Sequence, residues 1–179
     1  MNGAALTLAA VLLAAAPRAE PPNWYTHVWG TFGFHSGFLI GGDYTVKITE
    51  YFQILPTGPS FWGLERHEEL LRPGSRRTYT RTTWVDGRRC PALAARFKKI
   101  SSISGPQPQS PGERPILPLA TDSGLYSIDV PAGYGEGAPA HLVVANEYQG
   151  PVVDWVKDTL KAVEGCWRET PPVQAKKGD

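Results

Sequence analysis

Two chain segments on either side of a Pro-Gly turn carry the side chains best suited to binding. If residues 72–74 form a three-residue loop between two strands, Leu71 faces Ser75 across the hairpin and Glu69 faces Arg77. That register pairs opposite charges and collects six polar side chains on one face: Glu65, His67, Glu69, Arg77, Tyr79 and Arg81. Carboxylates, guanidinium groups, an imidazole and a phenol together could hold a polar partner, so this face is our candidate binding surface. A solvated face of salt bridges with no ligand is the simpler alternative.

Glu50 is the most unusual carboxylate, because the alternation of residues 44–54 places it on the apolar side of a strand, among Val46, Ile48 and Phe52. A buried carboxylate without a partner has a raised pKa and can act as an acid or a base. A strand end that turns Glu50 to solvent, or an arginine that pairs with it, would make the residue structural. Glu50 with a histidine is the pair on which a small hydrolase would depend.

Motifs for metal, cofactor or nucleophilic chemistry are absent from the sequence. The histidines are scattered over four segments, and none has the spacing that places two imidazoles on one metal ion: His27, His35, His67 and His141. No G-x-S-x-G elbow occurs, and no glycine-rich loop has the spacing that cradles phosphate. We therefore expect no metal and no cofactor, and we favour a protein that is not an enzyme.

The two cysteines, Cys90 and Cys166, are expected to form a disulfide. They lack the Cys-x-x-Cys spacing of structural zinc sites and of redox motifs. Cys90 precedes one expected helix and Cys166 follows the other, so two antiparallel helices would bring these residues together. Two free buried thiols are the alternative.

The amino-terminal residues resemble a secretory signal peptide, which we assign to residues 1–19. The run from Ala4 to Ala16 is apolar except for Thr7, and it is too short to span a bilayer. About 160 residues remain, enough for one ordinary domain, which we place at 20–167. Within it, 105–118 is expected to be an exposed Pro-rich loop, and 168–179 a disordered tail.

The strands and helices that must position these residues can be predicted from the spacing of apolar residues and from the turn residues between segments. A period-two pattern predicts a strand at 44–54. Composition and the turn residues between segments predict further strands at 23–34, 61–70, 76–85, 125–130 and 140–148. Apolar stripes at helical spacing, each after a proline, predict two helices that begin near Pro91 and Pro151. The expected fold is α+β: an antiparallel sheet, made of a four-stranded meander plus a two-stranded segment, with two helices packed on one face and a disulfide.

Charge and hydropathy limit the partners. Lysine plus arginine total 18 against 17 for aspartate plus glutamate, so the overall field does not favour nucleic acid. No window after the leader is apolar enough to span a membrane. We expect a periplasmic or secreted, non-catalytic module that binds an envelope protein, a peptide or a glycan; the alternative is a small periplasmic hydrolase that uses Glu50 with a histidine.

Overall fold

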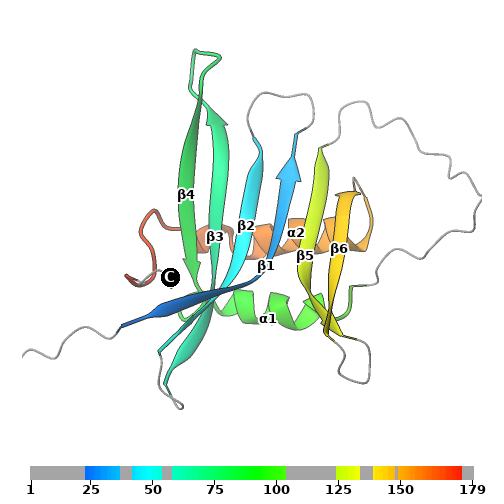
Figure 1. Cartoon of the computed structure of the whole chain (residues 1–179). Coiled ribbons are helices and arrows are strands. Elements are labelled where there is room, and N and C mark those ends of the chain that lie inside the picture. Colours follow the sequence, from blue (N-terminus) through cyan, green and yellow to red (C-terminus); the bar gives the residue numbers. More distant parts are fainter. Residues whose placement is uncertain are drawn as a thin grey trace, which may run out of the picture.

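One antiparallel sheet of six strands and two helices make up the described part of the chain (Figure 1). The structure is a computed structural model that describes residues 23–36, 42–53, 58–103, 124–133, 139–147 and 149–174. The expected signal peptide at 1–19 and the expected Pro-rich loop at 105–118 lie outside these residues. Among the described residues, no helix has the length and apolar character that crossing a bilayer requires.

The strands appear in the chain as β1 (Tyr25–His35), β2 (Tyr44–Phe52), β3 (Ser60–Leu71), β4 (Thr78–Asp86), β5 (Leu125–Gly133) and β6 (Pro139–Glu147). Their order in the sheet is β4-β3-β2-β1-β5-β6, so β1 lies in the interior between β2 and β5. The helices are α1 (Pro91–Ile100) and α2 (Pro151–Ala162), and a short 3-10 turn, η1 (Glu164–Cys166), follows α2. The predicted α+β class, with an antiparallel sheet and two helices, is confirmed.

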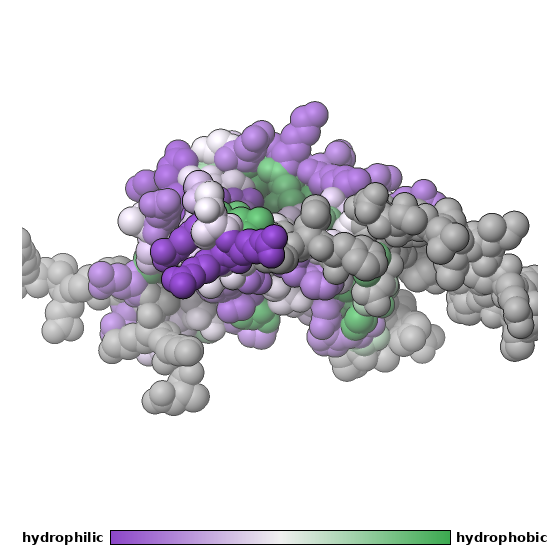
Figure 2. Space-filling model, turned by 90° about the horizontal axis from the view of Figure 1, so that it is seen from above, coloured by the Kyte–Doolittle hydropathy of each residue, from purple (hydrophilic) through white to green (hydrophobic). Residues whose placement is uncertain are grey.

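The core lies between the sheet and the helices. Phe32 of β1 is 1% exposed and meets Trp155 of α2 edge to face, with ring centroids 5.3 Å apart. Leu93 of α1 belongs to the same buried cluster, and both helices cross behind the sheet in Figure 1. We call the face of the sheet that carries Phe32 the inner face and the opposite one the outer face. Among the described residues seen from above in Figure 2, hydrophilic ones form most of the visible surface and hydrophobic ones show in small areas.

The predicted disulfide between Cys90 and Cys166 is confirmed, with Cα atoms 6.0 Å apart. Cys90 is the N-cap residue of α1, and Cys166 ends η1 just beyond α2. Pro91 and Pro151 occupy the first helical positions, where the missing amide hydrogen costs nothing. The bond therefore joins the start of one helix to the end of the other.

The predicted register of the β3–β4 hairpin is wrong. Leu71 lies opposite Thr78 instead of Ser75, because the loop is longer than three residues. The Arg72 amide donates to the Arg77 carbonyl at 2.9 Å, and the Ser75 amide donates to the Arg72 carbonyl at 3.1 Å. Gly74 has a φ of 74°, the left-handed conformation that the third position of a type II turn requires.

This correction separates the six residues of the predicted binding face. Directly opposite residues share a face, and Glu65, His67 and Glu69 lie opposite Trp84, Thr82 and Thr80 on the outer face. The remaining strand residues of the set, Tyr79 and Arg81, lie opposite Leu70 and Glu68 on the inner face. Arg77 precedes β4 in the exposed turn.

The carboxy-terminal segment keeps backbone pairing past the expected end of the domain at position 167. Arg168 forms an isolated antiparallel bridge with Trp84 of β4, with N–O distances of 2.8 and 2.9 Å. The guanidinium of Arg66 stacks 4.2 Å from the centre of the Trp167 ring. Both contacts anchor the chain after η1 beside the β3–β4 pair.

Candidate functional site

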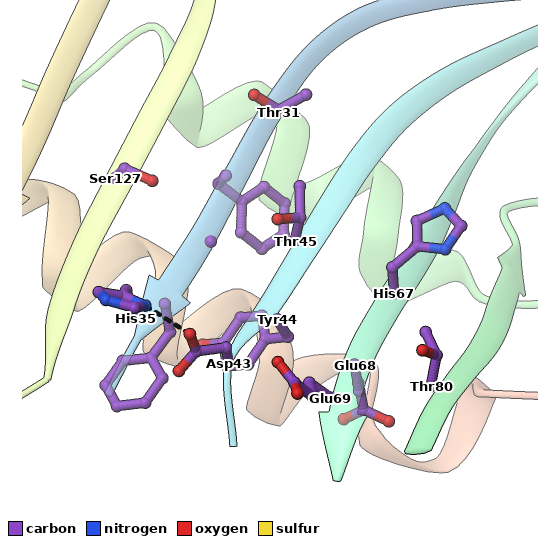
Figure 3. Close-up of a pocket in the computed structure, with 13 residues that line it drawn as sticks. Thr31, His35, Asp43, Tyr44, Thr45, His67, Glu68, Glu69, Thr80 and Ser127 are labelled. Atoms are coloured by element: carbon purple, nitrogen blue, oxygen red, sulfur yellow. Dashed lines mark hydrogen bonds and ion pairs between the residues drawn. The ribbon is translucent and has the colours of Figure 1, made fainter. Parts of the chain in front are cut away.

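A hollow of about 400 Å³ opens on the outer face of the sheet near the end of β1 (Figure 3). Side chains from five adjacent strands line it, because residues two apart on a strand point to the same face. Its hydrogen-bonding groups come from Ser127 of β5, Thr31 and His35 of β1, Thr45 of β2, His67 and Glu69 of β3, and Thr80 of β4, with Asp43 just before β2.

Asp43 orients the imidazole at one end of the hollow. Its carboxylate accepts hydrogen bonds from Nδ1 of His35 and from the backbone amide of Ser36, the latter at 2.8 Å. Partial burial disfavours the charged carboxylate, but the Ser36 and His35 hydrogen bonds outweigh it and hold the pKa of Asp43 below its ordinary value. Asp43 is therefore a fixed negative charge at the rim of the hollow.

This lowered pKa predicts a pH dependence of stability. Because the pKa of Asp43 is lower in the folded than in the unfolded chain, its ionised form stabilises the fold above about pH 4. That contribution disappears as the pH falls through the folded value. In urea unfolding at a series of pH values, Asp43→Asn should be less stable than the unchanged protein at pH 6, and the difference should shrink below about pH 4. Glu164→Gln, at an exposed position, is the control; a difference for Asp43→Asn that stays constant with pH would contradict the prediction.

His67 is held at both ring nitrogens. Nε2 lies 2.5 Å from Oε1 of Glu65, and the Thr82 hydroxyl lies 3.1 Å from Nδ1. An imidazole that donates from Nε2 and accepts at Nδ1 satisfies both contacts. Glu65 also lies 3.5 Å from Nζ of Lys47. With both nitrogens engaged, His67 forms part of the wall and is poorly placed to transfer protons.

A third pair of the same kind lies further along the outer face, where Nδ1 of His141 is 3.0 Å from Oδ1 of Asp129. The strand pairing places Asp129 opposite Thr31, which lines the hollow. Three of the four histidines thus pair with a carboxylate on this face. Such pairs keep the face polar and its side chains oriented.

The charged side chains on the inner face beside the hollow form ion pairs: Glu68 pairs with Arg66 and with Arg81. Glu68 lines the hollow at its edge, and its carboxylate lies 2.9 Å from Nη2 of Arg81 and 3.2 Å from Nε of Arg66. The hydrogen bond and charge of Glu68 raise the pKa of Arg81. Arg81, predicted to lie on the same face as His67, lies on the opposite face of the sheet, where it pairs with Glu68.

Glu50 is half-buried and has no protein partner among the described residues. Its register position is opposite Trp62 on one side and His27 on the other. The neighbouring Thr49 and Tyr51 are the fully buried residues here, so the strict alternation that predicted a buried Glu50 breaks down at this end of β2. No hydrogen bond joins Glu50 to His27 in the described part of the chain, and neither lines the hollow.

Within the described ranges, no three His, Cys, Asp or Glu side chains gather as ligands for a metal ion. The hollow offers oriented acceptors and hydroxyl donors on a sheet face, which suits hydrogen bonding to a polar chain. Comparisons with family models, curated proteins and solved structures found no match for this chain.

Proposed function

We propose that this protein is a non-catalytic binding module of the periplasm or the extracellular medium, and that it holds a basic segment of another exported protein on its outer sheet face. The observation that carries the proposal is the hollow itself. It has a volume of about 400 Å³, and hydroxyl, imidazole and carboxylate groups line it from five strands.

The charge of the hollow favours a basic partner. Asp43, Glu65 and Glu69 carry carboxylates on this face, and Lys47, 3.5 Å from Glu65, is the lysine that the described ion pairs place beside one of them. Glu68 is already neutralised by two arginines. Complementary charge at an interface steers the encounter and rejects partners of the same sign, so a segment with lysine or arginine suits the hollow better than an acidic one.

Binding agrees better with this geometry than catalysis does. The imidazole of His67 has both nitrogens engaged, and Glu50 is outside the hollow. The hydrolase alternative has one supporting observation, which is that His27 lies opposite Glu50 in the strand pairing. Export is supported by the apolar leader in the sequence and by the Cys90–Cys166 disulfide, which is typical of oxidising compartments.

The test is capture of a partner by charge-reversal variants. Tagged protein that starts at residue 20 is incubated with a solubilised envelope fraction and with culture medium of its source. We expect one stoichiometric partner, and Glu69→Lys should weaken its affinity about tenfold or more, because a cation replaces an anion at the site. Raising the salt concentration should weaken the complex as well.

Tyr79→Ala is the control, because Tyr79 is also exposed and lies on the neighbouring strand, but the strand pairing places it on the inner face. It should retain the partner. An equal loss of partner affinity in the two variants would indicate general destabilisation, and it would refute the assignment of the binding site to the outer face. Displacement of the partner by a neutral oligosaccharide, with no effect of Glu69→Lys, would show that the ligand class is wrong.

A further inference from the structure

A second site lies on the other side of the sheet, between α1 and the inner face. Two cavities of about 370 and 500 Å³ lie there, and Trp29 and Ile100 line both of them. Trp62 and Phe97 complete the wall of the first, and Ile103 and Leu142 contribute to the second. Apolar cavities of this size, with a few polar groups at the rim, are the usual form of a small-molecule site.

A β-bulge shapes this space. The register of β1 against β2 shifts between Val28 and Gly30, so Trp29 is the extra residue and is turned toward the helix side. A Cβ on Gly30 would lie 2.7 Å from the carbonyl oxygen of Asp129, so glycine allows β1 to approach β5 closely. The bulge places the indole of Trp29 in the lining of both cavities.

The aromatic wall is built as one unit. The rings of Trp29 and Trp62 meet edge to face with centroids 6.0 Å apart, and Trp62 meets Phe97 in the same way at 6.0 Å. All three side chains are only partly buried. In α1, Leu93 is the fully buried residue, whereas Phe97 and Ile100 of the same helix line the cavities.

The rim of the first cavity carries a cation. Lys98 lines it, and among the described residues its ammonium group forms no ion pair. The sequence from Pro91 to Ile103 contains Arg96, Lys98 and Lys99 and no acidic residue. A lysine can lay its methylene stem along an apolar wall while its charge stays at the surface.

We propose that this site binds a single-chain anionic amphiphile of the fatty-acid class, with the hydrocarbon tail in the two cavities and the carboxylate on Lys98. The apolar lining accounts for the tail and the unpaired cation for the head group. This inference is independent of the proposed outer-face function, because the two sites lie on opposite faces of the sheet.

Tryptophan fluorescence tests the proposal directly. Bromine quenches an indole that it contacts, so we would titrate the protein with a bromine-labelled C16 fatty acid below its micellar concentration. We expect saturable quenching with one ligand per protein. The double variant Trp29→Phe, Trp62→Phe should lose most of the quenching amplitude; undiminished quenching in that variant would place the ligand elsewhere, and absence of saturable quenching would overturn the proposal.

Two adjacent lysines provide the matched pair for the head group. Lys98→Glu should weaken binding of the fatty acid about tenfold or more, whereas Lys99→Glu, which makes the same charge change outside the lining, should weaken it less than about threefold. The alcohol of the same chain length should bind both variants equally. Equal effects of the two lysine variants on the acid would refute the role of Lys98. Glu69→Lys should leave fatty-acid binding unchanged. Failure of the fatty-acid proposal can therefore be distinguished from failure of the outer-face proposal.

Discussion

Phe32→Ala should lower the free energy of unfolding by about 3–5 kcal/mol, the usual cost of removing a buried phenylalanine ring. Phe32 is 1% exposed, and it lies on a strand that has neighbours on both sides. Its ring contacts Trp155, whose Nε1 donates to the carbonyl oxygen of Arg96 at 3.2 Å. The cavity left by alanine would therefore border a fixed indole that cannot easily collapse into it. Urea unfolding followed by circular dichroism measures the loss.

Thr31→Ala is the control for this prediction, because Thr31 is the preceding residue and faces the outer hollow. Its substitution should cost no more than about 1 kcal/mol. Similar losses for the two variants would mean that the core does not lie on the face to which the structure assigns it.

Replacing Cys90 and Cys166 together by alanine should lower the free energy of unfolding by about 4 kcal/mol on the chain-entropy model, less any strain. The bond spans 76 residues, so its loss greatly increases the freedom of the unfolded chain. The urea concentration at the unfolding midpoint should be lower for the variant than for the unchanged protein. Reduction of the unchanged protein should lower its midpoint in the same way.

A reductant separates this effect from damage caused by the substitutions. The unchanged protein should become as unstable as the variant when dithiothreitol is added, and the variant should not respond. Insensitivity of the unchanged protein to the reductant, or two freely alkylated thiols in a non-reduced sample, would contradict the prediction.

The helices and strands could be predicted closely because each has a strong local signal. The expected helix starts at Pro91 and Pro151 are the observed ones, since proline is tolerated at the first helical position. The strand expected at 44–54 is observed at Tyr44–Phe52, where apolar and polar residues alternate. The disulfide was predictable from the same helices, because their ends must meet if they are antiparallel.

The hairpin register was not predictable from charge pairing, because more than one register pairs opposite charges. The expected register paired Glu69 with Arg77, and the observed one pairs Glu68 with Arg81. Turn geometry decides between them: the type II turn at Pro73 and Gly74 is followed by two more residues before the strands pair. An odd shift moves one strand's side chains to the opposite face, which is why Tyr79 and Arg81 lie on the inner face and not beside His67.

The hollow combined predicted and unpredicted residues. The sequence predicts His67 and Glu69 as binding residues but not Asp43 and His35, because neither of these belongs to a recognisable motif. Their proximity arises from the β1–β2 pairing, in which Phe34 lies opposite Tyr44. The apolar cavities are not predicted from sequence: Gly30 and Gly33 indicate a bend or a close approach in this strand, but they do not show that a bulge turns Trp29 toward the helices.

The Cys90–Cys166 bond also determines how the protein responds to proteases. A single cut anywhere between the two cysteines leaves the amino-terminal and carboxy-terminal fragments covalently joined. When the cut falls before Pro151, the first fragment keeps β1 to β4 and the second keeps the whole of α2, whose Trp155 packs in the core against Phe32 of β1. Because the tether keeps the effective concentration of the halves high, a nicked molecule can close again without meeting a second molecule. Such a molecule would migrate as one species without reductant and as two with it.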